Sequence, residues 1–487
     1  MNENKKFILN IQSIALLLYG VSILPSIAVS FHYNETGITT SLAMISLGSI
    51  LIGIIGYHSL SNDLSNVSLK ICYYTTVTTW LIVILLSALP YYAAGRGYEL
   101  IDCLYTATAS WTTCGTTAIP LDTMPSGLLL WRSTCNWMGG IGIILLTLSF
   151  LPSWQFIGQK LASTEIRGPG FLMSNLTFRK AYRRIMLVYL GFTILQFIAL
   201  RLCGMPRFTA VLTTLSNTST SGVLHLNNGV LTTFPSSIKI VISFFAFLSS
   251  INISVFVLLV YGKIDTLKKN SELKFYIAYV LSIALTLYLI ISFERDNPLA
   301  LDKAGSILMQ TVSFTSTAGF IVTDCTLWSA ACQTLIIIMM FFGACAISTG
   351  GGIKISRICM ALYCMKTSMF RTLHPNGIRD IKFNGEVSTP KEIARVNVYI
   401  LLFMITFFFG SLALTIDGTS VIEALSYSQA MLTNCGTPVT HLSEPGLLGS
   451  FGVVSKLALS FLMLCGRLEI YPVLLLFTKK FLNTNEY

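Results

Sequence analysis

Residues 101–115, IDCLYTATASWTTCG, join a short apolar stretch directly to a Thr-Cys-Gly sequence. As a helix, the apolar part near 101–112 would be about 18 Å long, well short of the ~30 Å hydrocarbon core of a membrane. A full-length apolar run near 126–152 follows it. The stretch therefore predicts a short helix that enters a membrane part of the way, a polar loop, and then a spanning helix.

Three further copies of this arrangement follow along the chain. Short apolar stretches near 207–218, 303–315 and 421–432 each precede a loop glycine and a later apolar run. The four loop glycines are Gly115, Gly222, Gly319 and Gly436. Their spacing of about 100 residues is longer than the 20–50-residue period of solenoid proteins. All four copies run in the same sense, so they can surround one axis normal to the membrane.

Ten apolar runs are long enough to cross a membrane. They lie near 7–31, 39–60, 73–94, 126–152, 183–204, 236–261, 275–293, 331–364, 394–416 and 448–478. The predicted fold is an all-α polytopic membrane protein with about ten transmembrane helices and four span–short helix–loop–span repeats around a pseudo-fourfold axis. We divide the chain into two N-terminal helices and four repeats, at 1–70, 71–155, 156–265, 266–370 and 371–487.

The composition agrees with this prediction. Of the 487 residues, 53% are hydrophobic and 11% charged, whereas a soluble domain carries about 25% charged residues. The net charge of +11 comes from loops between apolar runs, which the positive-inside rule explains without a nucleic-acid partner.

The charged loops also predict an orientation. Basic residues gather in alternate loops, at Lys160, Arg167, Arg179, Lys180, Arg183, Arg184, Lys263, Lys268, Lys269, Lys274, Arg357, Lys366, Arg371, Arg379, Lys382, Lys391 and Arg395. The opposite side is richer in acids, which would concentrate cations there. We therefore expect both termini in the cytoplasm, with the four short helices entering from outside.

The four glycine loops are the first candidate site. They consist of Thr113-Cys114-Gly115, Thr220-Ser221-Gly222, Thr317-Ala318-Gly319 and Asn434-Cys435-Gly436. Non-helical backbone at membrane depth must be buried or line a watery cavity, and its carbonyls can then replace the hydration shell of an ion. We expect hydroxyls from Thr113, Thr220 and Thr317 to add ligands. Ordinary turns are the alternative for any single loop, but four equivalent loops favour a cation filter.

A second candidate lies inside the run 331–364, where Ser348, Thr349, Gly350, Gly351 and Gly352 follow one another. Each glycine costs about 1 kcal/mol relative to alanine in a helix. The sequence therefore predicts an unwound segment below the filter; a kinked, closely packed helix is the alternative.

Arg467, deep in the last apolar run, is the third candidate. An intramembrane arginine is costly and is a functional candidate by default. We expect it to meet the glycine-rich segment of the neighbouring repeat; a structural ion pair with Glu469 is the alternative. Lys456 is expected to extend toward the outer surface.

Together these motifs resemble the Trk/Ktr/HKT superfamily of cation transporters, most closely its bacterial Trk-type membrane subunit, over nearly the whole chain. The residues that carry the resemblance are Trp137-Met138-Gly139-Gly140-Ile141-Gly142, Ser348 to Lys354, Gly466-Arg467-Leu468-Glu469-Ile470 and His374-Pro375-Asn376.

The resemblance implies potassium uptake across the bacterial inner membrane, through a homodimer with an intramembrane gating loop opposed by an arginine. It also implies cytoplasmic TrkA-like regulatory subunits that bind NAD(H) or ATP, with membrane lipid as surroundings and no organic cofactor in this chain. Relatives with glycine at all four filter positions are usually potassium-selective. This sequence departs from the family pattern at Cys114, Asn434 and Cys435, where small or hydroxyl residues are commoner.

Two other functions are alternatives for this sequence. A symporter that couples potassium to protons or sodium would need ionisable residues near the midplane, and Arg467 and Glu469 are the two we expect there. An enzyme is disfavoured because the sequence has no GxSxG, HExxH or Walker A pattern.

Overall fold

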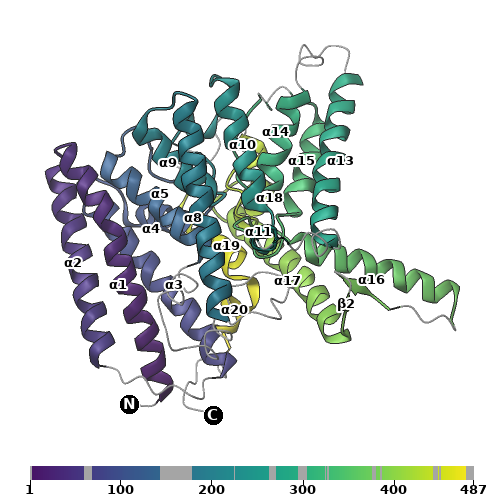
Figure 1. Cartoon of the computed structure of the whole chain (residues 1–487), viewed down its shortest axis with the longest axis horizontal. Coiled ribbons are helices and arrows are strands. Elements are labelled where there is room, and N and C mark those ends of the chain that lie inside the picture. The colour runs from purple at the N-terminus through teal and green to yellow at the C-terminus, as the bar shows by residue number, and fades with distance from the viewer. Residues whose placement is uncertain are drawn as a thin grey trace.

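The computed structural model describes residues 3–59, 68–142, 178–223, 225–260, 262, 270–293, 304–323, 325, 328–375, 380–383, 386–441, 448 and 451–478. Helices dominate these residues, and the only strands among them are β1 (Lys382–Phe383) and β2 (Glu386–Val387), which form a small antiparallel hairpin. The prediction of an all-helical membrane protein is therefore confirmed for the described part of the chain (Figure 1).

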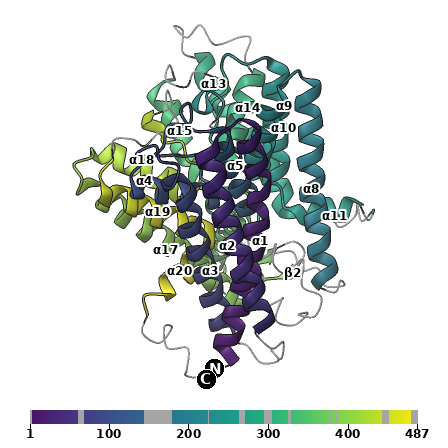
Figure 2. The ribbon, with the colours of Figure 1, turned by 90° about the vertical axis from the view of Figure 1, so that its left-hand side faces the viewer.

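The N-terminal helices α1 (Glu3–His32) and α2 (Thr36–Ser59) pack side by side, at the left edge of the molecule in Figure 1 and facing the viewer in Figure 2. Their approach depends on small residues, because a Cβ on Gly20 would lie 2.8 Å from the Ser46 carbonyl oxygen and one on Gly53 would lie 2.8 Å from that of Ser13. Small residues at such contacts are the usual way in which helices pack within a membrane.

Four groups of helices follow, each with the same order of elements. The long first helices are α3 (Leu69–Tyr92), α8 (Phe178–Leu202), α13 (Ser271–Phe293) and α17 (Pro390–Thr415). The short helices are α4 (Leu100–Trp111), α9 (Arg207–Thr218), α14 (Ala304–Thr315) and α18 (Val421–Leu432), with 12 residues each. The helices that come after each loop are α5 (Ser126–Ile141), α10 (Ser236–Ser250), α15 (Ala330–Phe341) and α19 (Val453–Leu468).

Within the described residues, six helices are long and apolar enough to cross a membrane, or seven if α10 and α11 (Ile253–Val260) count as one span bent by 90°. Three of the ten predicted spans are broken within the described residues: 236–261 divides into α10 and α11, 331–364 into α15 and α16 (Ile355–Leu373), and 448–478 into α19 and α20 (Ile470–Leu475). The end of the span predicted at 126–152 lies outside the described residues. The total of ten remains a prediction.

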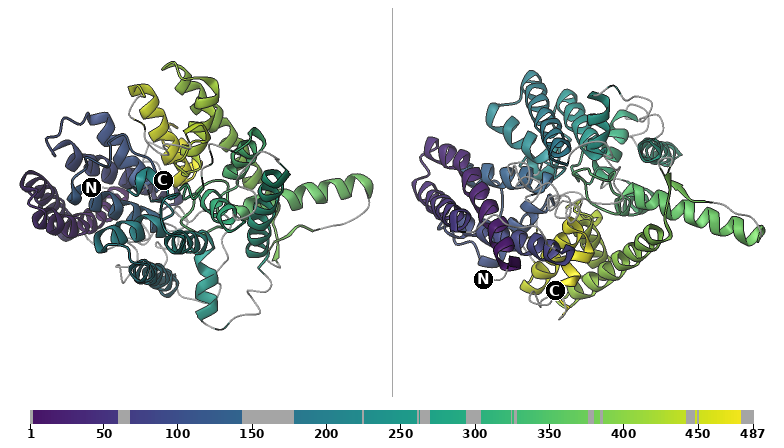
Figure 3. Two further views of the ribbon diagram at one scale, coloured as in Figure 1. Left: turned by 90° about the horizontal axis from the view of Figure 1, so that it is seen from above. Right: turned by 60° about the horizontal axis from the view of Figure 1, so that its bottom comes forward.

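Helix α16 projects from the body of the molecule, at the opposite end from α1 and α2 (Figure 3). Its projecting part exposes apolar side chains, among them Met365, Met369 and Leu373. The helix begins directly after the glycine-rich segment, so the site and this projection are continuous in the chain.

Candidate functional site

Each short helix ends in the same turn. The second residue after each helix has a left-handed backbone, with φ of 57° at Thr113, 57° at Thr220, 61° at Thr317 and 56° at Asn434. The next amide bonds back to a carbonyl five residues earlier, as Cys114 does to Ala109 at 2.9 Å, and Ser221, Ala318 and Cys435 repeat this bond at 2.9 to 3.0 Å. This is the Schellman ending of a helix.

Glycine is the usual residue at the left-handed position of such a turn. Here three threonines and an asparagine occupy it, although a side chain disfavours this backbone by about 1–2 kcal/mol. The same departure in four separate loops indicates that the surrounding structure imposes one backbone shape on all of them.

The glycine after each turn touches the next loop. A Cβ added to Gly115 would overlap the carbonyl oxygen of Ser221, one on Gly222 would overlap that of Ala318, and one on Gly319 would overlap that of Cys435. A Cβ on Gly436 would lie 2.6 Å from the backbone nitrogen of Gly115. The contacts therefore run from the first loop to the second, third and fourth and back to the first. We call residues 113–115, 220–222, 317–319 and 434–436 the loop ring.

Side-chain contacts attach the loop ring to the helices around it. The Cys114 thiol lies 3.5 Å from the Met431 sulfur on α18, and the Tyr105 hydroxyl contacts the same sulfur. Arg132 on α5, which is 2% exposed, donates to the Thr116 carbonyl at 3.1 Å. The Asn434 side chain donates to the Met463 carbonyl at 3.1 Å. The three predicted departures, Cys114, Asn434 and Cys435, are all buried within this packing.

Residues 342–354, between α15 and α16, form a non-helical segment that we call the inner segment. Its N-terminal half bonds to the break between α10 and α11: the Cys345 amide donates to the Ser250 carbonyl at 3.0 Å, and the Ile253 amide donates to the Ile347 carbonyl at 3.2 Å. Its C-terminal half runs back beside its beginning, and the Gly343 amide donates to the Ile353 carbonyl at 3.0 Å. Such bonding satisfies backbone groups that lipid could not.

The inner segment reaches the loop ring through its glycines. The Gly351 amide donates to the Thr317 hydroxyl at 2.7 Å, so this predicted ligand hydroxyl already has a partner in the segment. A Cβ on Gly350 would lie 2.8 Å from the Ser316 carbonyl, and one on Gly351 would overlap the Thr433 carbonyl. Gly352 has φ of +70°. The triple glycine therefore allows the segment to lie directly against two of the four loops.

Arg467, near the end of α19, joins the inner segment to the loop ring. Its guanidinium donates to the Thr349 carbonyl at 2.9 Å, to the Thr113 hydroxyl at 3.4 Å and to the Gly140 carbonyl at 2.6 Å, and it also bonds the Gly139 carbonyl. Arginine has five donors and remains charged in proteins. One buried side chain, 6% exposed, thus contacts the inner segment, the first loop and the end of α5.

Glu469, two residues later, pairs with Arg357 on α16 at 2.5 Å. The Arg357 guanidinium also lies 3.6 Å from the centre of the Tyr399 ring, a cation–π contact. Glu469 has φ 64° and ψ 153°, a backbone region that is almost restricted to glycine. Gly142, at the end of α5, has a similar backbone with φ 93° and ψ 130°. This ion pair therefore connects α16 to Glu469, two residues after Arg467 in the chain.

Buried charge is more extensive than the sequence indicated. Glu272 and Lys354 are 2% and 0% exposed, so Arg467 and Glu469 are not the only ionisable groups in the membrane part. The expectation for Lys456 was wrong, because its buried ammonium pairs with Asp102 on α4 rather than extending outward. Glu272 precedes the run 275–293, whereas Lys354 and Lys456 lie inside runs, and hydropathy alone could not show which of them the fold encloses.

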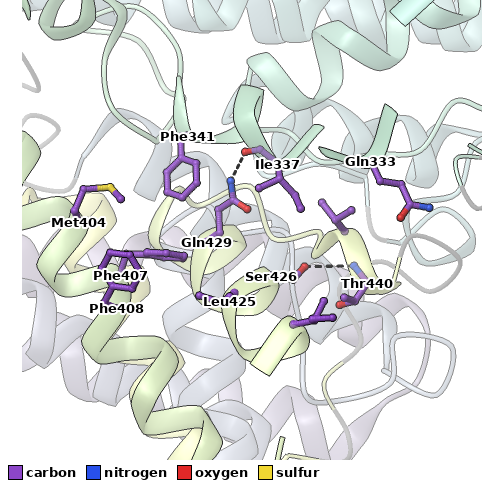
Figure 4. Close-up of a pocket in the computed structure, with 12 residues that line it drawn as sticks. Gln333, Ile337, Phe341, Met404, Phe407, Phe408, Leu425, Ser426, Gln429 and Thr440 are labelled. Carbon is purple, nitrogen blue, oxygen red and sulfur yellow. Dashed lines mark hydrogen bonds between the residues drawn. The ribbon is translucent and has the colours of Figure 1, made fainter. Parts of the chain in front are cut away.

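A separate cavity of about 430 Å³ lies beside the loop ring, between α15, α17 and α18 (Figure 4). Apolar side chains dominate its lining, including Phe341, Met404 and Phe407. At its edge Gln429 donates to the Ile337 carbonyl, and the Thr440 amide donates to the Ser426 hydroxyl at 3.3 Å. It holds no charged side chain among its lining residues and is distinct from the loop ring.

Comparison with known proteins gives matches over almost the full chain. Residues 43–293 and 296–485 match the TrkH family, described as a cation transport protein. The Trk system potassium uptake protein TrkH of Salmonella typhimurium is 26% identical, over 96% of this chain and 97% of the relative. TrkG of Escherichia coli, another Trk system potassium uptake protein, is 27% identical over 95% of each chain.

The fold is also similar to a solved structure. The crystal structure of the potassium transporter TrkH from Vibrio parahaemolyticus aligns with a TM-score of 0.85, covering 98% of this chain and 99% of that chain at 24% identity. At this level of identity the comparison establishes the shared fold.

Proposed function

The chain belongs to the TrkH family of cation transport proteins, and we propose that it takes up potassium across the bacterial inner membrane through the loop ring, under the control of the inner segment. Its relatives are transport proteins rather than enzymes, and potassium is the ion in the names of those relatives.

The closed contact of the four loops carries this proposal. Each loop glycine abuts the backbone of the next loop, so the four backbones converge on one axis, where their carbonyls can replace the water around a cation. Four turns of one shape suit an ion that needs several equivalent oxygen ligands. The C-terminal ends of the four short helices, where the helix dipole is negative, point to the same place.

The inner segment is the proposed gate. It bonds to the Thr317 hydroxyl below the third loop, and Arg467 places a positive charge between its Thr349 carbonyl and the Thr113 hydroxyl of the first loop. A cation that leaves the loop ring would meet both the segment and this charge. Transport then requires the segment and the guanidinium to move away from the axis.

The proposal also covers the number of spans, their orientation and the partners of the chain. We infer ten spans, cytoplasmic termini, a homodimer, and cytoplasmic TrkA-like regulatory subunits that bind NAD(H) or ATP. The projecting α16 supports a cytoplasmic contact, because it follows the inner segment directly, pairs with Glu469 through Arg357, and exposes Met365 and Met369. A partner that moved α16 would therefore act on the gate through the chain itself.

A coupled symporter is the second candidate. Glu272 and Lys354 favour it, because buried ionisable groups at membrane depth are typical of proton- or sodium-coupled transport. The two mechanisms differ in whether flux requires a second ion gradient.

Complementation tests the proposal most simply. In a host that lacks its own potassium uptake systems, the chain should restore growth at low external potassium, together with the host's own regulatory subunits. The exposed variant Glu392→Gln on α17 should grow equally well, whereas Gly436→Val, which places a side chain against Gly115, should not. Restored sodium uptake without potassium uptake would contradict the proposed substrate.

A further inference from the structure

We propose that Glu272 is a positioning residue that holds the inner segment in its observed conformation at Ala346, whereas Arg467 holds it at Thr349; the consequence for transport rests on the proposed function. Glu272 lies in the first turn of α13 and is 2% exposed. One carboxylate oxygen accepts the Ala346 amide at 2.6 Å, and the other accepts from the Asn252 side chain at 3.4 Å. The carboxylate thus bridges the inner segment and the break between α10 and α11.

A simpler role for this carboxylate would be to cap α13. Acidic residues in the first turn of a helix commonly bond to its free amides or complement its dipole. In α13 the capping bond comes from Asn270, whose side chain accepts from the Leu273 amide at 3.0 Å. Glu272 directs its two oxygens to Ala346 and Asn252, away from its own helix, so its bonds link the inner segment to the break between α10 and α11.

The next turn of α13 makes a second attachment to the same place. Tyr276, four residues after Glu272 and on the same face of the helix, bonds through its hydroxyl to the Ser250 hydroxyl at 2.7 Å. The Ser250 carbonyl in turn accepts the Cys345 amide at 3.0 Å. One face of α13 therefore fixes Cys345 and Ala346, where the inner segment begins its turn toward the loop ring.

The charged side chains that bond to the inner segment have charges that suit their backbone partners. Glu272, an anion, accepts from the Ala346 amide, whereas two cations bond to carbonyls further on: Arg467 to Thr349 and Lys354 to Gly350. Lys354 also donates to the Ser348 hydroxyl at 3.3 Å. The segment is held at Ala346 by a carboxylate from α13, and at Thr349 and Gly350 by Arg467 and by its own Lys354, and loss of the carboxylate should free the part nearest α13.

The rate of chemical modification of Cys345 measures how firmly this part of the inner segment is held. Cys345 is adjacent to Ala346 and 1% exposed, and Cys114, equally buried, lies in the loop ring and serves as the internal reference. The purified full-length protein is treated with N-ethylmaleimide, and the rate of Cys345 modification is measured by peptide mass spectrometry. We expect Glu272→Ala to raise this rate about tenfold, since the loss of hydrogen bonds to a charged group changes the equilibrium between held and free conformations by at least that factor. Glu272→Gln keeps an acceptor oxygen for the Ala346 amide and should give a smaller increase.

The controls separate positioning from general loosening. Glu392→Gln replaces an exposed carboxylate, which caps α17 together with Thr389, by an amide that can keep the capping bonds, and it should leave Cys345 protected. Wild-type protection of Cys345 in folded Glu272→Ala, or equal gains at Cys345 and Cys114, overturns the proposal. If the alanine variant does not fold, the glutamine variant must show the gain at Cys345, and unchanged protection there overturns it.

A flux measurement on the same protein distinguishes this inference from the proposed function. In proteoliposomes without any regulatory subunit, Glu272→Ala should conduct potassium several-fold faster than wild type, with unchanged preference for potassium over sodium. Faster Cys345 labelling with unchanged potassium flux would support the positioning role of Glu272 and contradict the gating role of the inner segment.

Discussion

At the scale of single residues, glycine is required where the loop ring closes. Gly115 has no room for a side chain, because a Cβ would overlap the Ser221 carbonyl of the next loop. Any larger residue must displace that carbonyl or its own loop. A displaced carbonyl changes the distances at which an ion is bound, and those distances, with the number of ligands, determine which ion is preferred.

We therefore predict that Gly115→Ser lowers the potassium-to-sodium permeability ratio by about tenfold, equivalent to ~1.4 kcal/mol. The ratio is measured from reversal potentials of the purified protein in lipid bilayers. Gly37→Ser, at a glycine with no atom within 4 Å of an added Cβ, is the matched control and should keep the wild-type ratio. An unchanged ratio in Gly115→Ser would show that Gly115 does not line the filter.

Arg467 is the second residue on which the account depends. Its guanidinium contacts Thr349, Thr113 and the end of α5 at once, and its charge opposes a cation at that point. We predict that Arg467→Gln raises basal potassium flux about tenfold in the absence of a regulatory subunit, since it removes the charge and several charge-assisted bonds. Arg467→Lys should retain most of the barrier because it keeps the charge.

The measurement is rubidium or potassium efflux from proteoliposomes, with protein incorporation matched between variants. If Arg467→Gln folds and conducts no faster than wild type, Arg467 is a structural link between α19, α5 and the inner segment and does not form a barrier.

At the scale of elements, the inner segment is an interruption of regular structure with an elaborate set of bonds. Its amides and carbonyls bond to Ser250, Thr317 and Arg467, which belong to three different parts of the chain. Removing residues 346–350 would take away the bonds to Glu272 and Arg467 together. We predict that this deletion raises potassium flux and makes it largely independent of the regulatory subunit.

The test compares flux with and without added regulatory subunit for wild type and for the deletion. The account expects strong dependence in the first case and little in the second. A deletion variant that reaches the membrane and keeps wild-type regulation would exclude the inner segment as the gate.

Helices and bends differ in how well the local sequence predicts them. The short helices were predicted within a residue of their observed bounds, as at 207–218 and 421–432, because apolar stretches and glycine loops are local signals. The 90° bend between α10 and α11 was not predicted. Ser249-Ser250-Ile251-Asn252 has no glycine or proline to mark it, and the bend is stabilised by residues distant in sequence, Glu272 and Cys345.

The same reason explains what was missed in the site. Thr113, Gly350 and Arg467 could be selected because glycine and charge are unusual inside apolar runs. Arg132 and Lys354 lie inside predicted runs and carried the same signal, whereas Glu272 could not be selected, since it stands just before the run 275–293, where charged residues are ordinary. Only the packing of several helices around them shows that they are buried.

At the scale of the whole molecule, contacts run from the loop ring through the inner segment to the projecting helix α16. Arg467 and Glu469, two residues apart, contact the inner segment and α16 respectively. A displacement of α16 would therefore be transmitted to Glu469 through Arg357 and to the inner segment through the chain. Under the proposed function, this connection would give a regulatory subunit a mechanical route to the inner segment without any contact to the loop ring.

The central claim is that potassium moves through a gated, selective pore without obligatory coupling to another ion. The reversal potential of the purified protein in a planar bilayer tests it most directly, with a potassium gradient present and the proton and sodium gradients varied independently. The account predicts a reversal potential close to the potassium equilibrium potential, unchanged when the proton gradient is altered. A reversal potential that shifts with the proton or sodium gradient in a fixed stoichiometric ratio would contradict it and establish coupled transport.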